Sequence, residues 1–481
     1  MTFSTQAFST QTKARQRCSW LPDLTIYPGP RYRALADAIS DAVRSGALPA
    51  GTRLPPQRLL ADALGVTTGT ITRAYAEAER RGILTALVGS GTYVRDHNTN
   101  KTPIFNHPVQ LEQGEIDLSM SLTIPDPTRI ERFGRALQQV SGDASALAAA
   151  LSYQPEQGMF ERRNTLAQWL TRYGVTATAE DLLLTQGGQH GIFTTLQSLL
   201  RPGELVLSDN LTYPGLIAAC KQLGLRHQGI AMDGEGMDVA ALERVCQQQH
   251  PRLIYLMPDL NNPTSIRMSI KRRHQLAELA ARYDFLILED ATQALPASER
   301  LMPLCEIAPE RACHLFSFSK LLAGGICVGV IKAPEHLMRL MKNALRAQCW
   351  MCPPLPATIL CQWIDSGEAD EQAQWQWHEV SERQRLVAHY LEGYVYRHNL
   401  YGFMVWLNLP DPWRASDFVQ AAMREGVRIL SAEPFCAGNH PAPQAVRFCV
   451  SPPGDRQQLE IALQRLQRLL QTPPQCMNML V

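Results

Sequence analysis

Apolar residues recur at helical spacing in three places within the first hundred residues. The first predicted helix covers residues 31–48, and a second, short helix follows the break at Leu54-Pro55-Pro56. After a tight turn at Gly65-Val66, Thr67 or Thr68 caps a third helix. The residues predicted to form the inner faces of these helices are Leu35, Ile39, Val43, Leu59, Leu60, Leu64, Ile71, Ala74, Tyr75 and Ala78.

A hairpin is predicted directly after the third helix, which Gly82 ends. Residues 83–94 form two short strands around the turn Gly89-Ser90-Gly91. Three helices followed by a hairpin is the element order of a winged helix-turn-helix. We place this domain at residues 27–95. The polar stretch that follows contains prolines and has no amphipathic period, so we expect a linker at residues 96–115.

The pattern changes after the linker, where apolar strands alternate with helical stretches. This alternation predicts an α/β domain, with a mostly parallel sheet covered by helices, over residues 116–475. The strands that stand out in the sequence are Leu182–Leu184, Leu205–Leu207, Leu253–Met257, Phe285–Leu288 and Leu315-Phe316.

The composition of the 481 residues fits a large globular chain that is cytoplasmic. Hydrophobic residues make up 45% and charged residues 19%, which excludes global disorder and fibrous classes. No stretch approaches about 20 consecutive apolar residues, and residues 1–20 hold no apolar run of signal-peptide length. The 12 cysteines are scattered irregularly, so we expect reduced thiols rather than disulfides.

The net charge of +1 hides an asymmetry between the two predicted domains. Residues 1–95 hold 12 Lys and Arg against 6 Asp and Glu, whereas the remainder holds 34 against 39. A basic module joined to a mildly acidic body indicates that only the first part meets a polyanion.

The start of the third helix has the chemistry of a DNA-reading surface. A recognition helix needs short polar residues that reach base edges and cations that contact phosphate. The candidate residues are Arg53, Arg58, Thr67, Thr68, Thr70, Thr72 and Arg73, with further charge at Arg80 and Arg81. The alternative is a three-helix dimerisation module whose arginines are only solvated.

Three strings within this module are more specific than any single residue. LPPQRLLADALGV at residues 54–66, TITRAY at 70–75 and GSGTYV at 89–94 closely resemble the GntR-type winged helix. The resemblance implies that Arg58 and Arg73 meet phosphate or base. Thr68 departs from the pattern, because members of that family commonly carry arginine there.

In the larger domain, polar groups follow strand ends, where open α/β sheets place their ligands. Gly187-Gly188-Gln189 opens a helix and could accommodate an anion, Asn262 could donate to a phenolate, and Asp290 could pair with a protonated ring nitrogen. Lys320 could form a Schiff base with an aldehyde. Taken singly, the same residues are equally a strand-to-helix turn, a turn starter, a helix cap and a solvated lysine.

Their order along the chain resembles that of fold-type I pyridoxal-phosphate enzymes, the aminotransferase superfamily. By that resemblance Lys320 carries the cofactor as an internal aldimine, Asp290 pairs with the pyridinium and Asn262 with the ring hydroxyl. Tyr213 stacks on the ring, and Gly188, Gln189 and Ser317 hold the phosphate. Tyr153 reaches the phosphate of a neighbouring subunit, and Arg447 clamps the carboxylate of an amino acid.

A GntR-like head on an aminotransferase-like body is the arrangement of the MocR subfamily of bacterial regulators, which WLPDL at residues 20–24 and GPRYR at 29–33 also resemble. The resemblance implies a homodimer that binds double-stranded DNA with repeated half-sites. It also implies that the body senses an amine, an amino acid or a form of pyridoxal phosphate through Lys320.

Three substitutions depart from the aminotransferase pattern. Cys327 replaces an arginine on the cofactor phosphate, Thr292 replaces a tyrosine at the ring hydroxyl, and Ser265 replaces a glycine. Losing the charged phosphate contact costs about 1.5–3 kcal/mol, so weakened cofactor binding is expected. Two alternatives stay open: a degenerate, cofactor-free dimerisation scaffold and, ranked last, an active aminotransferase. We expect no metal site, because Cys349-x-x-Cys352 lacks two further ligands at standard spacing and favours free thiols.

Overall fold

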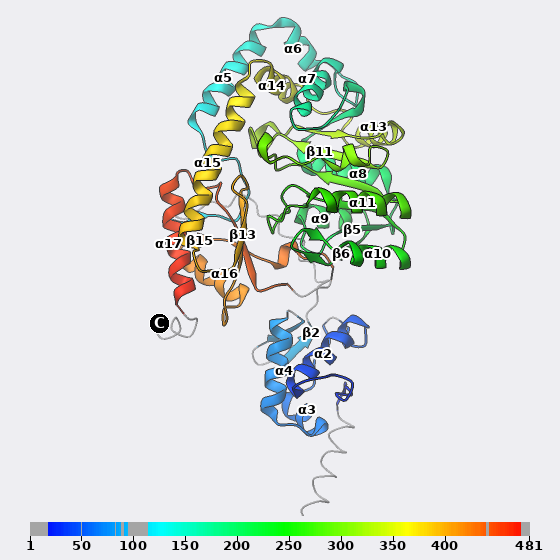
Figure 1. Cartoon of the computed structure of the whole chain (residues 1–481), viewed down its shortest axis with the longest axis vertical. Helices are drawn as coiled ribbons and strands as arrows, with labels where there is room; N and C mark the ends of the chain where they lie inside the picture. The colour runs from blue at the N-terminus through cyan, green and yellow to red at the C-terminus, as the bar shows by residue number, and fades with distance from the viewer. Residues whose placement is uncertain are drawn as a thin grey trace, which may run out of the picture. The chain divides into compact units, whose positions relative to one another are not determined.

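The computed structural model describes residues 18–49, 51–81, 83–87, 91–94, 114–438 and 442–472. They form two compact units, the first comprising residues up to 102 and the second nearly all residues that follow (Figure 1). The predicted linker lies almost entirely outside the described residues, as do Gly82 and two residues of the hairpin turn, Gly89 and Ser90.

The smaller unit has the predicted winged-helix order. Helices α2 (Arg31–Arg44), α3 (Gln57–Leu64) and α4 (Thr68–Arg80) precede an antiparallel hairpin of β1 (Leu84–Leu87) and β2 (Gly91–Val94). Thr67 is the cap of α4, since its hydroxyl accepts a hydrogen bond from the amide of Thr70 at 3.3 Å. Residues buried in this core include Leu35, Ile39, Leu60, Ile71, Ala74, Tyr75 and Ala78.

The larger unit is built on a seven-stranded sheet that is mostly parallel. Only β12 runs antiparallel to its two neighbours, and no strand was predicted at its position. The strands in spatial order are β4 (Leu182–Thr185), β12 (Gly329–Lys332), β11 (Ala312–Ser317), β10 (Leu286–Asp290), β9 (Pro251–Leu256), β5 (Leu205–Asp209) and β6 (Arg226–Ile230).

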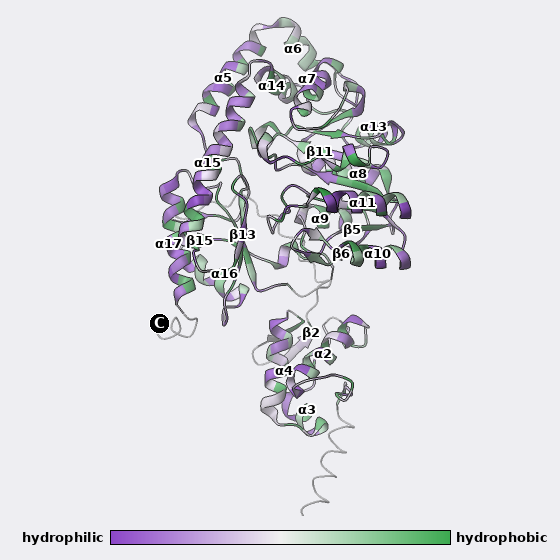
Figure 2. Cartoon of the chain, in the orientation of Figure 1, coloured by the Kyte–Doolittle hydropathy of each residue, from purple (hydrophilic) through white to green (hydrophobic). Residues whose placement is uncertain are grey.

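Helices cover both faces of this sheet. Alternate strand residues belong to two separate cores, as the pleat requires. One face packs on α8 (Gly187–Leu199), α9 (Pro214–Gln222) and α13 (Glu335–Cys349). The other packs on α7 (Phe160–Thr171), α10 (Val239–Gln248), α11 (Ile270–Tyr283) and α14 (Pro354–Asp365). The central strands are correspondingly apolar (Figure 2).

A second sheet, which the sequence pattern did not predict, has the order β13 (Tyr396–His398), β14 (Met404–Asn408), β17 (Ala445–Cys449) and β16 (Leu430–Ser431). It packs on α15 (Glu368–Tyr390), α16 (Ala415–Arg424) and α17 (Arg456–Gln471). The buried stripe of α17 contains Leu459, Leu463, Leu466 and Leu470. Ile461, which we expected in that stripe, is 37% exposed, because it lies off the i, i+4, i+7 face.

The remaining elements are short or peripheral. They are β3 (Ile116–Asp117), α5 (Pro127–Gly142), α6 (Ala144–Leu151), β7 (Met232–Asp233), β8 (Gly236–Met237), α12 (Leu304–Ile307), β15 (Val427–Arg428) and the 3-10 turns Ala179–Asp181, Ala297–Glu299, Gly324–Ile326 and Glu433–Phe435. Within the described ranges, no helix has the length and apolar character needed to cross a membrane.

Candidate functional site

A cavity of about 340 Å³ opens in the larger unit where the parallel strands end. The segments that follow β4, β5, β9, β10 and β11 all contribute to its wall, as expected for an open α/β sheet. Of the predicted residues, the cavity is lined by Gly188, Gln189, Tyr213, Asn262, Asp290, Ser317, Lys320 and Arg447, and also by Thr292 and Cys327.

Lys320 lies just beyond β11, with its amine at the cavity wall. The Nζ donates a hydrogen bond to the backbone carbonyl of Ser121, and the carbonyl of Lys320 accepts one from the side chain of Gln376. Burial lowers the pKa of Lys320 to about 8, and the nearby Arg447 also lowers it. A larger share of the amine is therefore neutral near pH 7 than in an exposed lysine, which suits attack on a carbonyl carbon.

Asp290 ends β10 and is held by two residues that fix its orientation. The Tyr255 hydroxyl donates to Oδ2 at 2.6 Å, and the Thr292 amide donates to Oδ1 at 2.9 Å. The Thr292 hydroxyl donates to Oδ1 as well. Burial raises the pKa of Asp290, so a cationic ring nitrogen beside it would supply the missing opposite charge. Thr292 thus orients the carboxyl group of Asp290.

Gly215 makes room for two cavity residues. A Cβ at this position would collide with the ring of Tyr213 and with the side-chain oxygen of Gln189. Gln189 also donates a hydrogen bond to the carbonyl of Gly215 at 3.0 Å. A glycine here therefore allows the tyrosine ring and the amide to lie together at the cavity wall.

Replacing Gly215 with alanine is expected to displace the Tyr213 ring and to weaken pyridoxal-phosphate binding about tenfold, the equivalent of about 1.4 kcal/mol. Equilibrium titration followed by absorbance measures the change. Gly234→Ala is the matched control, because a Cβ at position 234 meets no atom within 4 Å. Equal affinities for the two variants would contradict this role of Gly215.

Two buried polar groups at the cavity wall lack partners among the described residues. These are the Oδ1 of Asn262 and the Nε of Arg447. Arg447 lies on β17, with its Nη1 2.7 Å from the sulfur of Cys449 and its guanidinium carbon 4.9 Å from the centre of the Phe435 ring. Because buried polar atoms are normally hydrogen-bonded, both side chains are positioned to contact a polar ligand.

The phosphate end of the predicted site is formed by the start of α8 and the β11 segment. A Cβ on Gly188 would lie 3.3 Å from the hydroxyl of Thr292 and 3.5 Å from the Cβ of Ser317, so only the small glycine leaves this space open. Backbone amides at the start of a helix attract anions. Cys327, in place of a cation, is exposed and adopts φ +49°.

Two further predicted features have structural explanations. Ser265, where the resemblance favours glycine, has φ +56°, the conformation in which glycine is least strained. Its hydroxyl donates to the carbonyl of Met404 at 3.0 Å. Tyr153 does not line the cavity of its own chain and is 84% exposed, so its proposed contact with a neighbouring subunit stays a prediction.

The residues at the cavity fit pyridoxal phosphate. Its aldehyde meets the amine of Lys320, its ring nitrogen the oriented carboxyl group of Asp290, and its ring hydroxyl the unpartnered amide of Asn262. The phosphate meets the glycine-lined helix start, although no arginine is present at position 327.

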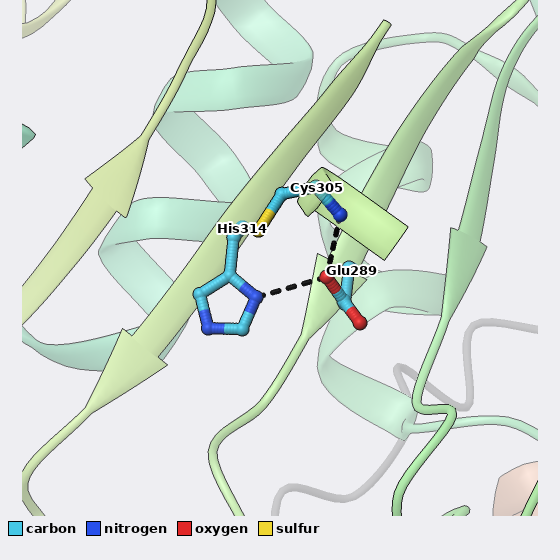
Figure 3. A group of neighbouring side chains, drawn as sticks. All are labelled: Glu289, Cys305 and His314. Atoms are coloured by element: carbon cyan, nitrogen blue, oxygen red, sulfur yellow. Dashed lines mark hydrogen bonds and ion pairs between the residues drawn. The ribbon is translucent and has the colours of Figure 1, made fainter. Parts of the chain in front are cut away.

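A second cluster of ionisable groups is buried beside this site, between β10 and β11. Figure 3 shows His314 and the backbone amide of Cys305 directed at the carboxylate of Glu289. The His314 Nδ1 lies 2.9 Å from Oε2, and an Arg273 nitrogen lies 3.8 Å from Oε1. These are the only three potential metal ligands that group together within the described ranges. Because the carboxylate is already neutralised by two cations, we interpret the cluster as a structural ion pair.

Replacing Glu289 with glutamine is expected to lower the free energy of unfolding by about 3–5 kcal/mol, because His314 and Arg273 lose their buried counter-charge. Interactions with Cys305 and Glu289 outweigh burial and raise the pKa of His314 from 6.5 to about 10. The folded protein therefore binds an additional proton between these values, and stability falls as the pH rises through this window.

Denaturant unfolding at pH 7 and pH 10 measures both effects. The pH-dependent loss is expected to be smaller in the Glu289→Gln variant, whereas the exposed Glu278→Gln control should behave as wild type. A Glu289→Gln protein as stable as the control would contradict the ion-pair interpretation.

The predicted DNA-contacting residues gather around α4 and its neighbours. Arg53, Arg58, Thr67, Thr68, Thr72 and Arg73 are exposed, and Thr70 is partly buried. Thr67 and Thr72 have local partners, since Thr67 caps α4 and the Thr72 hydroxyl donates to Gln57 at 2.7 Å. Arg80 and Arg81, in contrast, are ion-paired with Glu77, so they add less positive potential than their number indicates.

Known proteins resemble both units. The family described as bacterial regulatory proteins of the gntR family matches residues 31–94, and aminotransferase class I and II matches residues 115–466. The uncharacterized HTH-type transcriptional regulator YdeF of Bacillus subtilis (strain 168) is 30% identical over 94% of this chain and 97% of its own length.

Solved structures resemble the body. An archaeal alanine:glyoxylate aminotransferase has 25% identity and a TM-score of 0.67, over 74% of this chain and 91% of its own. LysN, an α-aminoadipate aminotransferase from Thermus thermophilus solved with N-(5'-phosphopyridoxyl)-L-leucine, has 24% identity and a TM-score of 0.67, over 75% and 92%. The latter similarity establishes the fold alone.

Fold, site and comparisons together define the class: a helix-turn-helix transcription regulator with a fold-type I aminotransferase-like body. The chain belongs to the class I and II aminotransferase family over its body and carries a GntR-type DNA-binding head. That combination makes it a member of the MocR subfamily, which confirms the resemblance seen in the sequence.

Proposed function

We propose that this regulator binds pyridoxal phosphate at Lys320 and uses the site to sense a small amine, an amino acid or a pyridoxal-phosphate-related compound. The observation that carries the proposal is that Lys320, Asp290 and Asn262, distant in sequence, line one cavity. Pyridoxal phosphate supplies an aldehyde that condenses reversibly with primary amines. An effector amine would compete with the Lys320 amine for it.

The residues of this chain divide the work of holding the cofactor. Asp290, oriented by Tyr255 and Thr292, would accept a hydrogen bond from the ring nitrogen. Asn262 would donate to the ring oxygen, and Tyr213 would pack on the ring. Gly188, Gln189 and Ser317 would hold the phosphate. Arg447 would bind an effector carboxylate, for which its planar guanidinium is suited.

A homodimer is part of the proposal. Large apolar side chains are exposed on α5 and α6 and beyond them, including Ile130 and Leu151 at 78% and 88%. The set comprises Ile130, Phe133, Leu137, Leu147, Leu151 and Tyr153. Exposed apolar groups of this size mark protein interfaces. We assign them to a second copy of the chain, whose cofactor phosphate Tyr153 would approach.

The head would place α4 in the DNA major groove. Thr67, Thr68, Thr70 and Thr72 at its start would contact bases or phosphates, and Arg53, Arg58 and Arg73 would contact phosphates or bases. Two heads in one dimer would favour operators with repeated half-sites. The cytoplasm, where DNA and amino acids are both present, is the proposed location.

The test is the visible absorbance of the purified protein during titration with pyridoxal phosphate. A new band supports the proposal, and a further spectral change with a panel of amino acids would identify the effector class. No band at any concentration would contradict it and favour the cofactor-free scaffold that Cys327 suggests. Release of keto acid from an amino acid in repeated turnovers would instead establish an active aminotransferase.

A further inference from the structure

Two thiols lie together next to the phosphate end of the cavity. Cys349 is the last residue of α13, and Cys352 precedes α14. The two side chains are hydrogen-bonding partners, and Cys349 also contacts the side chain of Gln186. The Cys352 sulfur lies 3.3 Å from the carbonyl oxygen of Leu184. Both cysteines are partly exposed.

The backbone between the thiols is bent into a strained turn. The Met351 amide donates to the Cys349 carbonyl at 2.7 Å, and Trp350 has φ +65° and ψ −54°. These are the features of a γ-turn that non-glycine residues rarely adopt. The turn is held from outside, because the Trp350 ring lies 4.7 Å from the Arg346 guanidinium carbon and 6.0 Å from the Tyr153 ring. Strain that surrounding contacts maintain is typical of functional segments.

The dithiol is coupled to the cavity through one residue. Gln186 is the N-cap of α8, lines the cavity and directly precedes Gly187-Gly188. Its amide donates to the His190 Nδ1 at 3.0 Å, which ties it to the first turn of α8. A change at Cys349 therefore reaches the backbone that would hold the phosphate.

We infer that Cys349 and Cys352 are a reversible redox site that forms an intramolecular disulfide in exchange with a small-molecule disulfide, and that its state alters the start of α8. A regulatory effect on the cofactor rests on the proposed function, whereas the disulfide itself does not. A metal site is disfavoured, because no third potential ligand joins this pair among the described residues.

The exchange proceeds in two balanced steps. The Cys349 thiolate attacks one sulfur of the small disulfide, forms a mixed disulfide and releases one thiol. The Cys352 thiolate then attacks the Cys349 sulfur and releases the second thiol, so the protein dithiol is oxidised as the reagent is reduced. Cys349 attacks first because hydrogen bonds from Gln186 and Cys352 favour its thiolate. Burial raises the pKa of both thiols, which makes the reaction slow.

Full-length protein equilibrated with mixtures of glutathione disulfide and glutathione, then alkylated and analysed by mass spectrometry, tests the inference. We expect one disulfide linking Cys349 to Cys352, reversed by excess glutathione. Cys352→Ser should accumulate glutathione on Cys349, and Cys327→Ser, which removes an exposed single thiol, should form the disulfide as wild type does. Full alkylation of both cysteines in folded protein at every ratio would overturn the inference.

Hydrogen exchange of residues 186–190 in the two states provides the readout at the cavity, and it needs no cofactor. We expect at least a threefold change in exchange rate between oxidised and reduced wild type, and none for Cys349→Ser. Unchanged exchange with a formed disulfide would overturn the coupling to α8. If the disulfide forms and exchange changes but neither state binds pyridoxal phosphate, the proposed function fails and the redox inference stands.

Discussion

Replacing Lys320 with alanine is expected to abolish the visible absorption that wild-type protein acquires with pyridoxal phosphate. The Nζ of Lys320 is the amine at the cavity wall, and its pKa of about 8 keeps a reactive neutral fraction near pH 7. The other cavity residues contribute only non-covalent contacts, so the variant should release the cofactor on dialysis. Absorbance and cofactor content after dialysis measure the effect.

The matched control is Lys221→Ala, which removes an exposed lysine from the last turn of α9. This variant should retain the band and the bound cofactor. A Lys320→Ala protein that still shows the band would assign the covalent contact to another amine and contradict the proposed role of Lys320.

Replacing Arg73 with alanine is expected to weaken DNA binding by about 1–3 kcal/mol, roughly 10- to 100-fold. Arg73 is exposed on α4 and forms no ion pair with any residue that the structure describes, so its charge is free to meet DNA. Fluorescence anisotropy with a duplex that wild-type protein selects from a random-sequence pool measures the affinity. If Arg73 contacts phosphate, the salt dependence should also decrease by about one unit.

Arg80→Ala is the control on the same helix, because the Arg80 guanidinium is bound to Glu77 at 2.7 Å. Its DNA affinity should stay within about threefold of wild type. Equal losses for the two variants would indicate a general electrostatic effect and contradict a specific contact by Arg73.

Much of the fold follows from local patterns in the sequence. The helix–turn–helix core needs only the 3.6-residue period of apolar positions and the cap at Thr67, both visible as letters. The buried strands were recognisable as continuous apolar runs, since parallel strands in this sheet are covered on both faces. The second sheet was missed because its strands are short and β16 has only two residues.

The cavity residues were predicted from order along the chain, but their supporting contacts were not. Tyr255 lies inside a buried apolar run, and nothing in that run indicates that its hydroxyl meets Asp290, 35 residues away. The role of Gly215 depends on where the side chains of Tyr213 and Gln189 lie. The pairing of Cys349 with Cys352 depends on the backbone of Trp350, which residue type does not dictate.

The most direct test of cofactor-dependent regulation is the DNA affinity of wild-type and Lys320→Ala proteins with and without pyridoxal phosphate. Coupling between two sites in a protein typically changes affinity by about 5- to 150-fold. We predict that the cofactor changes the DNA affinity of wild type by at least about fivefold and leaves Lys320→Ala unchanged. Identical DNA affinities for wild-type protein with and without cofactor, at concentrations where absorbance shows the site to be filled, would contradict the account.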